Sequence, residues 1–434
     1  MFHYVLLIVG GIFLGAIINW AIYAWAIFLK RPISPWMKPA EGASPRTLLD
    51  RIPIIGWPGR QRDLAIHGKA FWVRPFLIEI GCAIFVPWFY YWQSTGGLTG
   101  GDIPAEGIAA LANLWFWGQG ILLALICIGT FIDFDEKTIP DQVTVTGTII
   151  ALLIAAFAPA FRLPQPAVFG MATAPTIAPL NYASPGELPN LHLGLGAMAI
   201  ALAIYAIWIW ALLPKLPVWY VGFRKSCRFM VAYAIQPKRK TNCELRTKDR
   251  ATPGLTIILG VLFVLGMIAI PVAWTSGRLP PLNQASLFGA FVGLAFGGGM
   301  VWAIRIVGTY ALQKEAMGFG DVTLHAMIGA FLGWQAALLI FVIAPFAALL
   351  VVLLQFVLTR QSVVAFGPYL SAATVILLFN WAVIWPRAAG GVFANIPLLF
   401  ATLAVCLVLM AAMLAVIAWF KGMFSAEETE KADA

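Results

Sequence analysis

Long apolar runs separated by short polar segments dominate this chain. The runs are continuous rather than alternating, so they predict membrane-spanning helices and not a β-barrel. A spanning helix needs about 20 mostly apolar residues. Eleven stretches are candidates, near residues 4–29, 71–93, 108–134, 143–161, 192–213, 254–275, 287–311, 322–340, 342–358, 367–386 and 393–420. We expect the stretch from 322 to 358 to break near Ala344–Pro345, with Gly333–Trp334 as an earlier alternative.

The composition agrees with this pattern. Of the 434 residues, 61% are hydrophobic and 11% are charged, which is not the balance of a soluble globular domain. The predicted fold class is therefore all-α, a polytopic transmembrane helical bundle of about eleven spans.

The basic residues predict the orientation of the spans, because cytoplasmic loops carry an excess of Lys and Arg. Segments 30–74 and 214–253 are rich in both, whereas 96–107 and 164–191 contain neither. This alternation puts the N-terminus outside and the C-terminus in the cytoplasm. The excess of Lys and Arg in these loops accounts for the net charge of +9. Topology and contact with anionic membrane lipids explain the basic loop 214–253 better than nucleic acid does.

Two acidic motifs stand where spans begin or end. The first runs from Asp133 to Asp141, and the second from Glu315 to Asp321. The alternation of loops puts both on the cytoplasmic side. Carboxyl groups beside hydrocarbon usually have a function, and two of them that share one proton can activate water. The sequence thus predicts an aspartic protease site that contains Asp133 and Asp321.

Each motif residue also has a structural interpretation. Asp141 follows a proline and precedes an apolar run, so it is a candidate N-cap, and Asp321 is open to the same interpretation. Gly318 and Gly320 would permit unusual backbone conformations and a close approach to substrate. His325, one turn beyond Asp321, either tunes the titration of that aspartate or is a packing residue. We expect packing.

Glycines recur at every fourth position of one apolar run, at Gly289, Gly293 and Gly297. Such a face lets two helices approach closely. We expect it to bring the loop that carries Asp321 against its neighbours.

These motifs resemble the type IV prepilin peptidases, a family of membrane aspartic proteases. The family pattern of an aspartate followed eight residues later by Pro-Asp is similar to Asp133 and Pro140–Asp141. The pattern Glu-x-Met-Gly-x-Gly-Asp is similar to residues 315–321. Weaker similarity covers residues 15–23, 51–57, 74–79 and the Phe-Gly-Pro at 366–368.

The resemblance implies an endopeptidase that removes the leader of pilin-like precursors at the cytoplasmic face of the bacterial inner membrane. Asp133 and Asp321 would be the catalytic pair, supported by Gly318, Gly320, Asp141 and Glu315. Proteolysis would need no cofactor or metal. Many members also methylate the new N-terminus with S-adenosylmethionine, so that cofactor is possible here.

The sequence departs from the family in three ways. The first loop lacks the two Cys-x-x-Cys pairs associated with zinc, and methylation is tied to that region. Thr323 stands where the family commonly has Lys. Residues 164–253 look like an insertion with an extra span. The expected regions are 1–107, 108–163 with the first aspartate, 164–253, 254–392 with the second, and an extra span and tail at 393–434.

Other functions remain open at this point. A transporter or proton relay would also use paired carboxylates, although these typically lie near the middle of the bilayer. A non-catalytic paralogue could keep the motifs. A protease of the presenilin type shares Gly-x-Gly-Asp, but the Pro-Asp and Phe-Gly-Pro neighbours fit the prepilin peptidases better.

Overall fold

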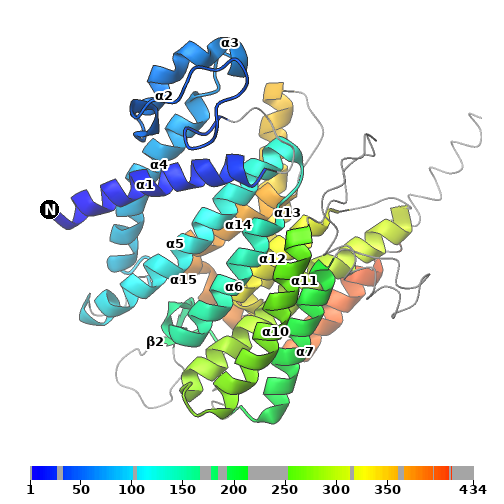
Figure 1. The fold of residues 1–434 in the computed structure, drawn as a ribbon. Coiled ribbons are helices and arrows are strands. Elements are labelled where there is room, and N and C mark those ends of the chain that lie inside the picture. Colours follow the sequence, from blue (N-terminus) through cyan, green and yellow to red (C-terminus); the bar gives the residue numbers. More distant parts are fainter. Residues whose placement is uncertain are drawn as a thin grey trace, which may run out of the picture.

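The structure is a computed structural model that describes residues 2–26, 33–100, 105–166, 177–183, 193–213, 253–312, 317–359, 366–393, 395–409 and 412. Most of these residues are helical (Figure 1). The long helices are α1 (Phe2–Ala24), α4 (Val73–Ser94), α5 (Ala105–Glu136), α6 (Asp141–Phe157), α7 (Leu195–Leu212), α10 (Pro253–Thr275), α11 (Pro281–Leu312), α12 (Phe319–Leu332), α13 (Trp334–Thr359), α14 (Gly367–Phe379) and α15 (Trp381–Gly390).

Six of the described helices are long and apolar enough to cross a membrane, and a seventh span results if α14 and α15 are counted as one. Those two helices meet at an angle of 88°. Four further apolar helices are shorter, among them α6 and α12. The expected class, an all-helical polytopic membrane protein, is confirmed. The count of eleven spans and the sidedness of the termini stay predictions.

The long run from 322 to 358 breaks at Gly333, so the expected break at Ala344–Pro345 was wrong. Gly333 has a φ of +95°, a left-handed conformation that glycine adopts at little cost. It separates α12 from α13, whereas Pro345 lies inside α13. Proline is tolerated inside membrane helices because neighbouring groups satisfy the freed carbonyl. The earlier alternative at Gly333–Trp334 is the correct one.

The most extensive helix pairing joins α11 to α12, and glycines make it possible. A Cβ atom on Gly293 would lie 2.0 Å from the carbonyl oxygen of Gly329, and one on Gly297 would lie 2.6 Å from that of His325. Larger residues would therefore push the helices apart. Gly289 instead faces the guanidinium of Arg162 at 3.5 Å. The glycine face thus holds α12, the helix that carries Asp321, against α11.

Two smaller units complete the fold. A two-stranded antiparallel sheet joins β1 (Pro164–Pro166) to β2 (Ile177–Pro179), next to the short helix η3 (Pro159–Phe161). Between α1 and α4, residues 33–72 form a compact lobe, which we call the loop block. Its helices are η1 (Leu49–Arg51), α2 (Gly56–Gly59), η2 (Arg60–Asp63) and α3 (Leu64–His67), seen in blue at one end of the molecule in Figure 1.

Candidate active site

The two aspartates of the motifs lie at the ends of two helices that contact each other. Asp133 is in the last turn of α5, and Asp321 is in the first turn of α12. Both α5 and α12 also contact α14, which begins at Gly367. The carboxyl groups are close enough to interact electrostatically, although 188 positions of chain separate them (321 − 133). The structure therefore brings together the residues that the two motifs nominated.

The backbone of Gly367 lies beside both carboxylates. Its N–H faces both of them, so one amide can donate toward either aspartate. A Cβ atom at this position would lie 2.7 Å from Oδ2 of Asp133 and 2.7 Å from Cδ1 of Ile139. Only a residue without a side chain leaves Asp133 in this position. The glycine of the Phe-Gly-Pro motif is thus part of the site.

Both aspartates are nearly inaccessible, with 4% of Asp133 and 8% of Asp321 exposed. The Oδ2 atom of Asp133 accepts no hydrogen bond of normal geometry from the described part of the chain. Lys137, one turn further on, interacts electrostatically with Asp133. A buried carboxylate oxygen without a partner costs free energy. A proton shared with Asp321, or a water molecule between the two groups, would remove that cost.

The turn before Asp321 is shaped by contacts rather than by unusual dihedral angles. Gly318 is the N-cap of α12 with φ −66°, an ordinary extended conformation, so the expectation of special glycine dihedrals was wrong. A close approach does occur, because a Cβ on Gly320 would lie 3.0 Å from Cβ of Ile139. The amide of Gly318 also faces the Asp321 carboxylate. Asp321 is the third residue of α12 and not its cap.

Two further side chains hold this turn. Arg305 of α11 donates from Nε to the carbonyl oxygen of Met317 at 2.8 Å, and its guanidinium lies 5.8 Å from the centre of the Phe319 ring. Thr323, which replaces the expected lysine, donates from its hydroxyl to the carbonyl of Gly320 at 3.0 Å. The threonine therefore supports the backbone and supplies no cation.

The other nominated residues are Asp141, His325 and Glu315. Asp141 is the first residue of α6, and Pro140 occupies the cap position, so the N-cap interpretation was wrong by one residue. A carboxylate there still suits the positive end of the helix. His325 is buried, and Nε2 lies 3.1 Å from the carbonyl oxygen of Ala337, which supports its interpretation as a packing residue. Glu315 lies outside the described residues.

The sequence motifs did not reveal the contributions of Gly367, Ile139 and Arg305. The Phe-Gly-Pro string was a signal for Gly367, but only the fold places it against Asp133. Ile139 had no signal beyond its place between the two aspartates of the first motif. Arg305 lies on a different helix, and a single arginine near the end of an apolar run looks like a topology signal.

A nearly buried pair of carboxyl groups at the ends of apolar helices, with a backbone amide beside both, has the form of an aspartic hydrolase site in a membrane protein. The comparisons point to the same class. Residues 253–353 match the model of the Type IV leader peptidase family. That stretch contains Asp321 but not Asp133.

Named relatives are prepilin leader peptidase/N-methyltransferases. The chain is 38% identical over 103 residues to the one from Pectobacterium carotovorum subsp. carotovorum, a stretch that covers 23% of this chain and 35% of the relative. It is 32% identical over 94 residues to the one from Escherichia coli (strain K12), covering 21% and 42%. No solved structure was found to match the chain. The resemblance to the type IV prepilin peptidase family is confirmed, over stretches well short of two thirds of these relatives' length.

Proposed function

We propose that this protein is a membrane aspartic endopeptidase that removes the leader from pilin-like precursors, with Asp133 and Asp321 as the catalytic pair. The observation that carries the proposal is that these two carboxyl groups lie close to each other and share the Gly367 amide as a hydrogen-bond donor. The family match around Asp321 supports it independently.

In the proposed mechanism the pair holds one proton. The ionised carboxylate takes a proton from water as the water oxygen attacks the scissile carbonyl carbon. The protonated carboxyl group donates a hydrogen bond to the carbonyl oxygen, which gains negative charge. When the tetrahedral intermediate collapses, the C–N bond breaks and the amine leaves with a proton from the pair. Both carboxyl groups are then ready for another cycle.

The proposed substrate is a precursor with an apolar N-terminal helix that is already inserted in the membrane. The names of the relatives identify prepilins as their substrates. Both aspartates lie at helix ends, where the backbone of a membrane-inserted precursor would emerge from the bilayer. The basic loops of this chain support placing that surface on the cytoplasmic side of a bacterial inner membrane.

A proton relay is the second candidate function, and the position of the pair argues against it. Relay carboxylates in transporters typically lie near the middle of the bilayer, often where helices are broken. Here Asp133 is three residues from the end of α5, and Asp321 is the third residue of α12.

The names of the relatives also include N-methyltransferase, an activity that uses S-adenosylmethionine as methyl donor in this family. A cavity of about 330 Å³ lies between α1, the loop block and the end of α5. Tyr23, Phe71, Asp135 and Glu136 are among its lining residues. Aromatic rings suit an adenine ring, whereas Asp135 is paired with Arg74, which also lines the cavity. The aromatic residues fit the adenine part of the donor, which would supply a methyl group to the new N-terminus.

A zinc ion does not fit the described part of the chain. It contains no group of three His, Cys, Asp or Glu side chains arranged to hold a metal, and the loop block is cross-linked by Asp–Arg ion pairs instead. We assign no step to zinc.

The test is cleavage of a coexpressed pilin-like precursor, followed by gel shift and N-terminal sequencing of the product. Asp133→Asn and Asp321→Asn should each abolish cleavage while the protein still accumulates in the membrane. Asp135→Asn is the matched control, because Asp135 lies on the same turn of α5 but pairs with Arg74 instead of Asp321. Normal cleavage by either of the first two variants would refute the assignment.

A further inference from the structure

The loop block exposes a row of large aliphatic side chains. Leu48 is 80% exposed, Leu49 66% and Ile55 67%, and Ile52 between them is also exposed. The four residues lie on one short segment that includes η1 and ends at the start of α2. Single exposed aliphatic residues are common on protein surfaces, but four within eight positions form a patch.

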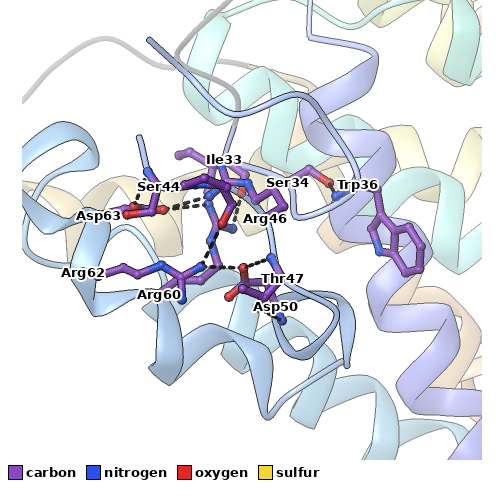
Figure 2. A network of polar contacts seen from close by, with 11 residues as sticks. Ile33, Ser34, Trp36, Ser44, Arg46, Thr47, Asp50, Arg60, Arg62 and Asp63 are labelled. Atoms are coloured by element: carbon purple, nitrogen blue, oxygen red, sulfur yellow. Dashed lines mark hydrogen bonds and ion pairs between the residues drawn. The ribbon is translucent and has the colours of Figure 1, made fainter. Parts of the chain in front are cut away.

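The interior of the same block is polar and charged. Asp50 and Asp63 are buried, and so is Arg60. Figure 2 shows the network that holds these groups. Arg62 pairs with Asp50, which also accepts a hydrogen bond from the backbone N–H of Thr47 at 2.7 Å. The block therefore turns two of its three carboxylates inward and Leu48 and Leu49 outward, which is the reverse of the usual arrangement in a domain surrounded by water.

The second aspartate is held in the same way. Asp63 pairs with Arg46 at 2.8 Å and accepts a hydrogen bond from the backbone N–H of Ser44 at 3.3 Å. Arg60 donates to the carbonyl oxygen of Ile33 at the other end of the block. These contacts join residues up to 27 positions apart, so the polar interior organises the whole block.

The exposed segment is fixed in place. Gly56 packs so tightly that a Cβ atom there would lie 2.4 Å from the carbonyl oxygen of Asp50. Trp57 is buried and donates from Nε1 to Glu79 of α4 at 2.9 Å. Glu79 also accepts a hydrogen bond from Asn19 of α1. The segment that carries the leucines is thus anchored to two helices that are candidate spans.

The surroundings of the patch match the interface of a membrane. The exposed ring of Trp36 lies 5.7 Å from the guanidinium of Arg51, also exposed. Tryptophan and arginine favour the headgroup region, where an apolar body and a polar end are both accommodated. The exposed charged residues of the block are four basic ones, Lys38, Arg51, Arg62 and Lys69, and one acidic one, Glu41. A positive surface is attracted to anionic lipids, and it repels a second copy of itself or the basic leader of a precursor.

We propose that the loop block docks on the anionic leaflet of the membrane, with Leu48, Leu49, Ile52 and Ile55 inserted at the boundary between headgroups and acyl chains. Trp36 and Arg51 lie at the headgroup level. The block is then an anchor at the membrane interface that holds the start of α4 at a fixed depth in the membrane. This proposal is independent of the catalytic assignment, because it rests on no residue of the aspartate pair.

Photo-crosslinking tests the proposal on the full chain. A benzophenone amino acid replaces Leu49 in one variant and Gln61, an exposed polar residue of the same block, in the control. Each protein is reconstituted in nanodiscs of phosphatidylglycerol and phosphatidylcholine that contain a labelled lipid. We expect at least a tenfold excess of lipid adduct at position 49 over position 61. Replacement of phosphatidylglycerol by phosphatidylcholine, or Arg51→Glu, should reduce the adduct several-fold.

Equal lipid labelling at positions 49 and 61 would overturn the proposal. So would adducts at position 49 that contain an added precursor or a second copy of the chain and no lipid. Cleavage of a precursor by the same variants provides a separate readout of folding, because Leu49 and Gln61 are exposed and lie outside the aspartate site. A failure of the proposed peptidase function would leave the lipid result unchanged.

Discussion

Replacement of Gly367 by alanine tests the geometry of the aspartate site without removing any chemical group. The alanine keeps the backbone N–H that faces both carboxylates, so only the methyl group is new. That methyl would lie 2.7 Å from Oδ2 of Asp133 and from Cδ1 of Ile139. An ordinary contact needs about 3.5 Å, so Asp133 or the start of α14 must move by roughly 0.8 Å.

A displacement of this size between catalytic groups lowers rates by about 10- to 100-fold. That corresponds to roughly 1.4 to 2.7 kcal/mol of lost transition-state stabilisation. The assay is the turnover number of purified enzyme in nanodiscs with a pilin-like precursor, followed by mass spectrometry. We expect turnover to fall while the midpoint of thermal unfolding changes little.

Gly120→Ala is the matched control. Gly120 lies on α5, the same helix as Asp133, and a Cβ there would meet nothing within 4 Å. Its turnover should stay within about twofold of the parent, since alanine also favours the helix. Should Gly367→Ala cleave as fast as Gly120→Ala, Asp133 would not be held where the structure places it, and the steric reasoning would be refuted.

Three further predictions concern the scaffold. Gly293→Ala should lower thermal stability and cleavage together, because its methyl would overlap α12, whereas Gly299→Ala, with open space, should do neither. Burial alone would raise the pKa of Asp63, but hydrogen bonds from a backbone amide and an arginine hold that pKa below its usual range. The ionised Asp63 therefore stabilises the folded loop block fully above about pH 4. This stabilisation is lost as the pH falls through the lowered pKa of the folded state, and faster digestion of the block by pepsin would detect the loss. Arg74 and Asp135 form a bidentate pair with both N–O distances at 2.9 Å. A double-mutant cycle on the free energy of unfolding should give a coupling of about 1 kcal/mol. If the two single substitutions lower the free energy of unfolding additively, the pair contributes no coupling and the prediction is refuted.

The sequence was sufficient to predict the helical class, and it nominated the two aspartates that the fold brings together, because both inferences depend on local signals. Apolar runs of spanning length mark helices, and carboxylates beside them are rare enough to be conspicuous. The glycines at positions 293 and 297 also predicted a close helix contact, since only small residues permit one. These predictions needed no knowledge of three-dimensional neighbours.

What the sequence left open depends on long-range contacts. Gly367 is part of the site only because α14 begins beside the end of α5, which no local pattern encodes. The break at Gly333 was ranked below Pro345, although proline is tolerated in an apolar helix and a left-handed glycine ends one. The polar interior of the loop block could not be foreseen either, because its Asp–Arg ion pairs join residues that are 12 and 17 positions apart in the sequence.

The central claim is that Asp133 and Asp321 act as one unit, and a double-mutant comparison of cleavage rates tests it most directly. Single-turnover rates are measured for Asp133→Asn, Asp321→Asn and the variant with both changes, all in the same nanodiscs. Groups that act together lose nearly all activity when either is removed. We predict that the three variants share the same residual rate. A double variant that is slower than either single variant by the product of their separate losses would contradict the account.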